Sequence, residues 1–262
     1  MSVKFISSRD NPLYKELKQL ATSSQARRRA RRTLLDGVHL CSAYLAQRGL
    51  PALCVAGESA QSNPEVAAVL ARCRDTHCVV LPDALYHALS QVENGIDLLF
   101  VIDTPQAGPP DALTGNAVLL DNLQDPGNLG SILRSAAAAG IRSVYCSAGT
   151  AFAWSPKVLR AGMGAHFGLE IHEQVDLVAL LAASEVAVLA TSSHAEERIY
   201  DVDLRQPVAW LFGHEGQGVS EALMALASKK VSIPHLGEME SLNVAASAAI
   251  CLFEQVRQKT AN

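Results

Sequence analysis

Three polar residues near the end of the chain lie where the backbone is expected to be exposed. Glu215 lies inside the glycine-rich stretch Phe212-Gly-His-Glu-Gly-Gln-Gly218, and Ser241 and Asn243 follow the pair Ile233-Pro234. Glycine and proline mark turns, and the free amide and carbonyl groups of a turn can bind a ligand. A carboxylate, a hydroxyl and an amide beside such turns can orient a substrate hydroxyl and take part in proton transfer. A plain structural turn is the competing interpretation.

A second polar stretch lies further upstream, at Asp121-Asn-Leu-Gln-Asp-Pro-Gly-Asn-Leu-Gly130, and precedes a helix predicted over Ser131–Ala139. It brings Asn128 close to that helix and Arg134 into its first turns. Free amides at the start of a helix favour anions, so the stretch resembles a phosphate cradle. It is neither G-x-G-x-x-G nor a P-loop with its Lys-Ser/Thr, which disfavours an ordinary dinucleotide or ATP site.

Short apolar strands are needed to position these stretches. The sequence predicts strands at Val186–Ala190, Val208–Phe212 and Lys230–Ile233, each followed by polar or glycine-rich residues. Open α/β sheets bind ligands at the carboxyl ends of their strands, and we expect the site there. A final helix from Val244 is apolar nearly all round through Phe253, which requires burial in the core or against a second subunit.

The first hundred residues predict a separate, smaller domain. Strands and helices alternate there, which is typical of an α/β unit. A proline-rich stretch that begins at Asp103 predicts a linker. We therefore expect one domain over 1–102, a linker over 103–115 and a second α/β domain over 116–262.

The basic residues are concentrated at the N-terminus although the net charge is −4. Residues 1–40 hold nine Lys and Arg side chains and only three acidic ones. A solvated charge run is one interpretation of the arginines between 27 and 32. A phosphate-binding surface is the other, since guanidinium groups match phosphate oxygens and each neutralised phosphate releases counterions.

The composition, 49% hydrophobic and 18% charged over 262 residues, allows one large or two modest cores. No apolar run reaches the ~18 residues of a membrane span, and the N-terminus lacks the apolar core of a signal peptide. We therefore expect a cytoplasmic protein that does not enter a membrane. The six cysteines are scattered without a Cys-x-x-Cys pair, so reduced thiols are expected rather than disulfides or a metal site.

Taken together, three blocks resemble the SpoU (TrmH) family of RNA ribose 2′-O-methyltransferases in the SPOUT superfamily. They are Asn128-Leu-Gly-Ser-Ile-Leu-Arg134, the stretch from Phe212 to Gly218, and Ile233-Pro234 with Ser241-Leu-Asn-Val244. The segment Pro156–Ala165 also looks like the family. The N-terminal domain resembles, more loosely, the ribosomal-protein-L30e-like substrate domain of family members, through Ile6–Pro12 and Asp36–Leu40. Many relatives have Glu where Asp36 stands.

The resemblance implies an α/β fold in which a C-terminal parallel sheet flanked by helices ends in a trefoil knot, with the smaller α/β domain ahead of it. It implies S-adenosylmethionine as cofactor, ribosomal RNA as the expected substrate, no metal, and a homodimer in which both subunits contribute to one site. By position, the implied catalytic residues are Asn128, Arg134, Glu215, Ser241 and Asn243. The implied cofactor contacts are Thr191, Phe212, Gly213, Gly218, Ile233, Pro234, Ser241, Leu242 and Asn243. The expected RNA contacts are Arg9, Arg27, Arg28, Arg29, Arg31, Arg32 and Arg134.

Three alternatives stay open. Transfer RNA is the rival substrate, and the separate basic domain favours ribosomal RNA over it. A catalytically silent RNA-binding protein on the same fold is the second, against which the complete set of polar residues argues. A doubly wound nucleotide-dependent enzyme of another kind is the third, and the missing dinucleotide fingerprint argues against that.

Overall fold

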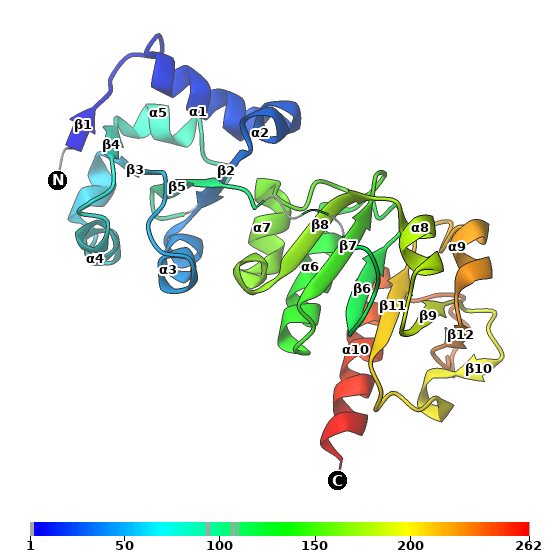
Figure 1. The fold of residues 1–262 in the computed structure, drawn as a ribbon. Coiled ribbons are helices and arrows are strands. Elements are labelled where there is room, and N and C mark those ends of the chain that lie inside the picture. The colour runs from blue at the N-terminus through cyan, green and yellow to red at the C-terminus, as the bar shows by residue number, and fades with distance from the viewer. Residues whose placement is uncertain (1–2, 93–94, 106–107, 109, 262) are drawn as a thin grey trace. The chain divides into compact units, whose positions relative to one another are not determined.

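The computed structural model describes residues 3–92, 95–105, 108 and 110–261 of the chain (Figure 1). Contacts divide the chain into two units. Unit 1 holds Met1–Pro105 with Trp154–Phe167, and unit 2 holds Gln106–Ala153 with Gly168–Asn262. Among the residues that the structure describes, none of the helices combines the length and the apolar character that a membrane crossing needs.

The segment Trp154–Phe167 is where these units depart from the domains expected at 1–102 and 116–262. Helix α7 (Pro156–Gly162) contacts strand β2 (Arg32–Asp36), and the Thr33 hydroxyl donates to the Trp154 carbonyl oxygen at 2.7 Å. These contacts join the segment to unit 1 although it lies far along the chain. The linker expected over 103–115 includes residues 106, 107 and 109, which lie outside the described residues.

Unit 1 is a small α/β domain on a five-stranded sheet in the order β1-β4-β3-β5-β2. The pairs β1/β4 and β4/β3 are parallel, whereas β5 is antiparallel to both β3 and β2. The strands are β1 (Val3–Phe5), β2 (Arg32–Asp36), β3 (Leu53–Gly57), β4 (Cys78–Leu81) and β5 (Leu98–Asp103). The helices are α1 (Pro12–Thr22), α2 (Ser24–Ala30), α3 (Val38–Gln47), the 3₁₀ turn η1 (Ser59–Ser62), α4 (Pro64–Arg72) and α5 (Asp83–His87). Strands β1 and β2 are not predicted from the sequence, because runs this short carry little periodicity.

Helix α1 packs its apolar face on this sheet. Asn11 caps the helix by accepting from the Leu13 amide at 3.0 Å, and Pro12 occupies its first turn. Leu17 and Leu20 are buried one turn apart and join the apolar side chains of the strands in one core. Each leucine buried in this way contributes about 1.5–3 kcal/mol to folding.

Unit 2 is a seven-stranded sheet in the order β10-β12-β9-β11-β6-β7-β8, in which neighbouring strands run parallel. The strands are β6 (Ala117–Leu120), β7 (Ser143–Ser147), β8 (Glu170–Val175), β9 (Ala187–Thr191), β10 (Glu197–Arg198), β11 (Val208–Phe212) and β12 (Lys229–Ser232). Its helices and 3₁₀ turns are α6 (Pro126–Ala138), α8 (Leu177–Ala182), η3 (Ile199–Asp201), α9 (Glu221–Leu226) and α10 (Val244–Thr260). The turn η2 (Ala165–Gly168) precedes β8. A parallel sheet flanked by helices is what the sequence predicts for this half.

Helix α6 begins five residues earlier than the predicted start at Ser131. Asp125 caps it by accepting from the Asn128 amide at 2.8 Å, and Pro126 supplies a first position that needs no amide. Asn128 therefore stands in the first turn of the helix rather than in the preceding loop. The Asp-Pro pair is the signal that marks this start.

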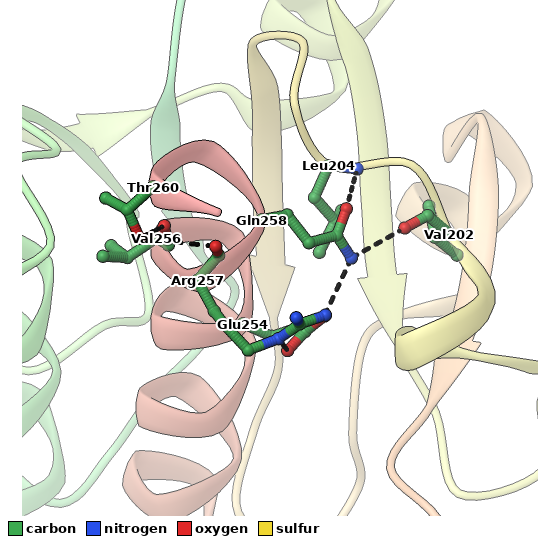
Figure 2. A network of polar contacts seen from close by, with 7 residues as sticks. All are labelled: Val202, Leu204, Glu254, Val256, Arg257, Gln258 and Thr260. Atoms are coloured by element: carbon green, nitrogen blue, oxygen red, sulfur yellow. Dashed lines mark hydrogen bonds and ion pairs between the residues drawn. The ribbon is translucent and has the colours of Figure 1, made fainter. Parts of the chain in front are cut away.

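A polar cluster, the α10 clasp, fixes the second half of α10 (Figure 2). The Gln258 side chain accepts from the Leu204 amide at 2.9 Å and donates to the Val202 carbonyl oxygen at 3.0 Å and to the Glu254 carboxylate at 2.8 Å. Arg257 donates to both Glu254 oxygens at 2.8 Å. Hydrogen bonding by Arg257 lowers the pKa of Glu254, although burial opposes the shift. The clasp ties α10 to the segment that follows η3.

We expect Gln258→Ala to destabilise the protein by about 1–3 kcal/mol, because three hydrogen bonds are lost and the Leu204 amide keeps no side-chain partner. Chemical denaturation followed by circular dichroism measures the change. Thr260→Ala is the matched control, since the exposed Thr260 hydroxyl bonds only to carbonyl oxygens of its own helix. Equal midpoints for the two variants would contradict a stabilising role for the clasp.

Candidate functional site

Three loops meet at one edge of the unit 2 sheet. Strands β12, β9 and β11 are adjacent and parallel, so their carboxyl ends lie at the same edge. Strands β11 and β12 are not adjacent, because β9 lies between them and adds Thr191 to the edge. Strand β6, on the other side of β11, leads into the start of α6.

Glu215 is the centre of the hydrogen bonding at this edge. One carboxylate oxygen accepts from the Gln124 amide at 3.0 Å. The other accepts from the Asp125 amide at 2.9 Å and from the Asn128 side-chain amide at 3.2 Å. The loop after β11 is thereby bound to the loop before α6, some ninety residues away along the chain.

Asn128 extends this network to the last helix. Its Oδ1 accepts from the Asn243 side-chain amide at 2.9 Å. Asn243 in turn caps α10, since its own Oδ1 accepts from the Ala245 and Ala246 amides at 2.9 and 3.2 Å. Glu215, Asn128 and Asn243 thus form one connected network, which we call the three-block network. Three of the five predicted catalytic residues are brought together in it.

The charge of Glu215 is held by its partners. Partial burial raises the pKa of Glu215, but the hydrogen bonds from the Gln124 and Asp125 amides and from Asn128 outweigh it, and the pKa lies below its ordinary value. The stabilisation that comes with these bonds is therefore present above the ordinary pKa and is lost as the pH falls through the lowered one. A carboxylate of this kind is a weak base and a good anchor.

The loop that carries Glu215 is a tight hairpin held by His214. His214 and Gly218 exchange backbone hydrogen bonds of 2.9 and 2.8 Å, and Gly218 has a φ of +71°. His214 Nδ1 accepts from the Gly216 and Gln217 amides at 2.9 and 3.2 Å. A Cβ on Gly213 would lie 2.1 Å from the Gly218 carbonyl carbon, so only glycine fits there.

We expect His214→Ala to loosen this hairpin and His214→Asn to preserve it. Alanine removes the acceptor of two amide protons, whereas the asparagine Oδ1 can accept at a similar position. Amide hydrogen exchange at 216 and 217 measures the effect, and about a tenfold faster exchange in the alanine variant corresponds to a loss of ~1.4 kcal/mol. Unchanged protection in His214→Ala would mean that the ring does not order the loop.

The predicted cofactor positions lie on the loops at this edge. The Thr191 hydroxyl donates to the Leu211 carbonyl oxygen at 3.4 Å. Phe212 is fully buried, and its carbonyl oxygen accepts from the Asp121 amide at 2.8 Å. Leu242 is 40% exposed, which leaves an apolar side chain open at a polar edge. The full set comprises Thr191, Phe212, Gly213, Gly218, Ile233, Pro234, Ser241, Leu242 and Asn243.

Arg134 and Ser241 are not part of the three-block network. Arg134 is six residues beyond Asn128 on α6, which directs it about 120° away around the helix axis. Its side chain is exposed, as is that of Ser241. Neither side chain makes a hydrogen bond or an ion pair with any residue that the structure describes.

The basic residues of unit 1 separate into two groups. Arg9, Arg28, Arg29 and Arg31 are exposed. Arg27, in contrast, is 6% exposed, and its guanidinium donates to the Leu20 and Ala21 carbonyl oxygens at 2.6 and 3.3 Å at the end of α1. Burial also lowers its pKa. The expectation that Arg27 contacts RNA is therefore corrected, because its side chain is buried and hydrogen-bonds to carbonyl oxygens at the end of α1.

Arg32 is intermediate between these groups. It is half-buried and its guanidinium lies 2.9 Å from an Asp103 oxygen and 3.6 Å from a Glu16 oxygen. Two acidic neighbours weaken its attraction for a phosphate.

Two residues of the site are not predicted from the sequence. Gln124 anchors Glu215 through its backbone, and its side-chain amide donates to the Gly149 and Asn122 carbonyl oxygens. His214 orders the hairpin. The contact of Gln124 is made by its backbone, so its residue type does not predict it. His214 could have been predicted, because it directly precedes Glu215 inside a glycine-rich turn.

Comparison with known proteins gives consistent matches. Residues 115–253 match the model of the SpoU rRNA Methylase family. The chain is 33% identical to an uncharacterized tRNA/rRNA methyltransferase of Synechocystis sp., over 98% of this chain and 94% of that protein. It is 28% identical to the 23S rRNA (guanosine(2553)-2′-O)-methyltransferase RlmP of Bacillus subtilis, over 96% of this chain and 98% of that protein.

Solved structures agree in fold. The SpoU methyltransferase AviRb from Streptomyces viridochromogenes, in complex with the cofactor AdoMet, is 27% identical, with a TM-score of 0.84 over 96% of this chain and 99% of that one. A crystal structure of an RNA 2′-O ribose methyltransferase is 31% identical, with a TM-score of 0.80 over 97% of this chain and 99% of that one.

Proposed function

The chain belongs to the SpoU rRNA methylase family, and from that premise we propose that it transfers a methyl group from S-adenosylmethionine to a ribose 2′-hydroxyl of ribosomal RNA. The three-block network carries the proposal. It joins Glu215, Asn128 and Asn243, one residue from each of the three family blocks, into one set of contacts. Asn243 also caps α10, and the whole network lies at the carboxyl edge of the sheet, where α/β proteins bind ligands.

The residues at the sheet edge fit S-adenosylmethionine. Beside the three-block network and the exposed Ser241, the edge offers backbone groups, the Thr191 hydroxyl and the exposed apolar side chain of Leu242. A neutral adenine ring with apolar faces and polar edges is suited to such a set, and the carboxylate suits a cation. Thr191, Gly213, Ile233 and Leu242 would hold the cofactor, which supplies a methyl group already activated by its sulfonium.

Orientation is the main contribution of this chain to catalysis. Holding a ribose hydroxyl in line with an activated methyl group removes much of the entropic part of the barrier. Asn128 is fixed on both sides, by Glu215 and by Asn243, and cannot rotate freely. Its amide is therefore a fixed reference against which a ribose can be positioned.

Arg134 is the candidate for contact with the substrate. Its guanidinium has no partner among the described residues and remains available for a phosphate or for the ribose oxygen. It does not act as a base, because guanidinium is not deprotonated in proteins. Glu215 has a lowered pKa, so water receives the hydroxyl proton late in the reaction.

The C-terminal loops form a trefoil knot in this proposal. The chain passes from β9 through β10, next to β12 at the edge of the sheet, to β11, and then returns to the other side of β9 as β12. After β12 it leads into α10, which packs on α6. This return of the chain to the other side of β9 supports the proposal that residues 233–243 are threaded. True knots are nearly absent from proteins, so a threaded backbone here would distinguish this fold from an ordinary doubly wound sheet.

A homodimer completes the proposal. Ala246 and Phe253 are exposed on α10, Phe253 at 47%, with half-buried Ile250 between them. Spacings of four and three residues place the three side chains on one face of the helix. An exposed apolar stripe beside small residues suits a second copy of the same helix.

We expect Phe253→Asp to convert the dimer into a monomer, because a charge at the centre of an apolar interface must be desolvated. Light scattering coupled to size exclusion measures the mass. Val178→Asp is the matched control, since Val178 is 46% exposed on α8. A dimeric Phe253→Asp variant would remove this face from the interface.

Unit 1 supplies the recognition of RNA in this proposal, as an L30e-like domain. Its exposed arginines 28, 29 and 31 offer guanidinium groups to phosphates. Ribosomal RNA is preferred over transfer RNA because the Bacillus subtilis relative, which aligns over 96% of this chain, is named for 23S rRNA. The name of the Synechocystis relative includes both classes and keeps transfer RNA as the alternative.

Methylation of purified RNA tests the function. The protein is incubated with radiolabelled S-adenosylmethionine and either ribosomal or transfer RNA, and modified positions are mapped by resistance of the 2′-O-methylated linkage to alkali. We expect label in ribosomal RNA at an alkali-resistant linkage. Label confined to transfer RNA would select the alternative substrate, and binding of cofactor and RNA without transfer would select the silent RNA-binding protein.

A further inference from the structure

Unit 1 contains a cavity of about 460 Å³ between helix α1 and its sheet. Side chains from α1 and from strands β3, β4 and β5 form its apolar walls: Leu13, Leu17, Leu20, Leu53, Val79 and Val101. Leu13 and Leu53 are only partly buried and pack on the edge of the core. The volume lies within the range of about 300–1,000 Å³ in which proteins bind small molecules.

Charged side chains stand at the rim of this cavity. Lys4, Glu16, Arg32 and His77 line it, and the Glu16 carboxylate lies 3.6 Å from the Arg32 guanidinium. Lys4, Glu16 and His77 are exposed. The rim therefore offers both donors and an acceptor beside an apolar interior, which favours a flat ligand with polar edges over an alkyl chain.

Exposed cations adjoin the rim along the chain. Arg32, which lines the cavity, directly follows Arg31, and α2 just before it carries Arg28 and Arg29. All three of these arginines are exposed. A ligand that inserts a neutral group into the cavity and carries phosphates outside it matches this distribution of charge.

We propose that the cavity binds one unpaired nucleobase of the RNA substrate, with the flanking phosphates on the exposed arginines 28, 29 and 31. The proposal rests on the proposed function, which makes RNA the substrate. Proteins read RNA mainly at single-stranded loops, where bases can leave the stack and enter a pocket. Leu13 and Leu53, the partly buried members of the lining, offer apolar surface to the base. The Glu16 carboxylate accepts from donors at the edge of the base, such as the N1–H and amino group of guanine.

Binding of a hairpin RNA with one 2-aminopurine in its loop tests the proposal on the full chain. We expect the fluorescence of that base to change on binding. We expect Ala52→Trp to lower the affinity by about tenfold, because Ala52 is exposed at the lining and a tryptophan there occupies the space of the base. Ala68→Trp, at an exposed position of α4, is the matched control. Glu16→Gln should leave the fold intact and reduce the advantage of guanosine monophosphate over uridine monophosphate as competitor.

Binding of a fully paired duplex RNA distinguishes the contribution of the phosphates from that of the unpaired base, because a duplex offers phosphates and no unpaired base. Wild type and Ala52→Trp should bind the duplex with equal affinity. Charge reversal at Arg29 and Arg31 should lower the affinity for both the hairpin and the duplex. Equal hairpin affinity and equal fluorescence in wild type and Ala52→Trp would overturn the proposal, as would a similar loss in Ala68→Trp. Methyl transfer is measured separately. Binding that depends on the cavity, without methyl transfer, would contradict the proposed enzyme activity alone. Normal methyl transfer, with RNA binding that does not depend on the cavity, would contradict the role of the cavity alone.

Discussion

Arg134→Ala should reduce methyl transfer to RNA by about 100- to 1,000-fold, the loss typical of removing one positioned donor from a reacting oxygen. The side chain is exposed and has no partner among the residues that the structure describes. Its removal therefore leaves no internal contact broken and should not change stability. Arg134→Lys should retain a little activity, because lysine keeps the charge but not the planar, forked set of donors.

Single-turnover transfer of a radiolabelled methyl group measures this effect, and calorimetry measures cofactor affinity in the same samples. Arg142→Ala is the matched control, since Arg142 is also exposed in unit 2. Cofactor affinity should be equal in all variants. Full activity of Arg134→Ala would exclude Arg134 from the reaction.

Glu215→Ala should reduce methyl transfer by about 100-fold while the protein still folds. The carboxylate accepts from two backbone amides and from Asn128, and without it the start of α6 loses its attachment to the hairpin. Misplacement of reacting groups by about 1 Å is enough for a loss of this size. Glu215→Gln should recover part of the activity, because one amide oxygen still accepts.

The pH profile distinguishes anchoring from base catalysis by Glu215. The lowered pKa of Glu215 keeps the anchoring form charged below the ordinary range of a glutamate, and acid should impair the site only beneath it. The rate of wild type should therefore stay level as the pH falls toward that range. The opposite result would be a wild-type rate that falls with an apparent pKa near the ordinary value for glutamate, together with no such fall in Glu215→Gln. That result would make Glu215 the proton acceptor.

Much of the site was predictable because its side chains follow strand ends or stand at the starts of helices. The strand at 208–212 and the start of α10 at Val244 match the structure, since apolar runs bounded by glycine or capped by Asn243 carry clear local signals. The identity of the family came from three blocks of residue types in a fixed order. These blocks also contain all three members of the network.

The remaining features depend on contacts that local sequence does not encode. The insertion of β9 between β11 and β12 follows from how the chain crosses the sheet. The burial of Arg27 follows from the free carbonyl oxygens of Leu20 and Ala21 at the end of α1, and an arginine run looks the same whether or not one member turns inward. The segment that leads into α7 bonds to β2 through Thr33 and Trp154, which lie 121 positions apart, and no local periodicity predicts such a pair.

Asn243 belongs to the helix cap and to the three-block network at once, because its Oδ1 accepts at the start of α10 while its side-chain amide donates to Asn128. Fraying of the first turn of α10 would therefore also release the partner that fixes Asn128. Gln258 attaches the opposite end of the same helix. The stability of α10 and the order of the three-block network are thus coupled through a single helix.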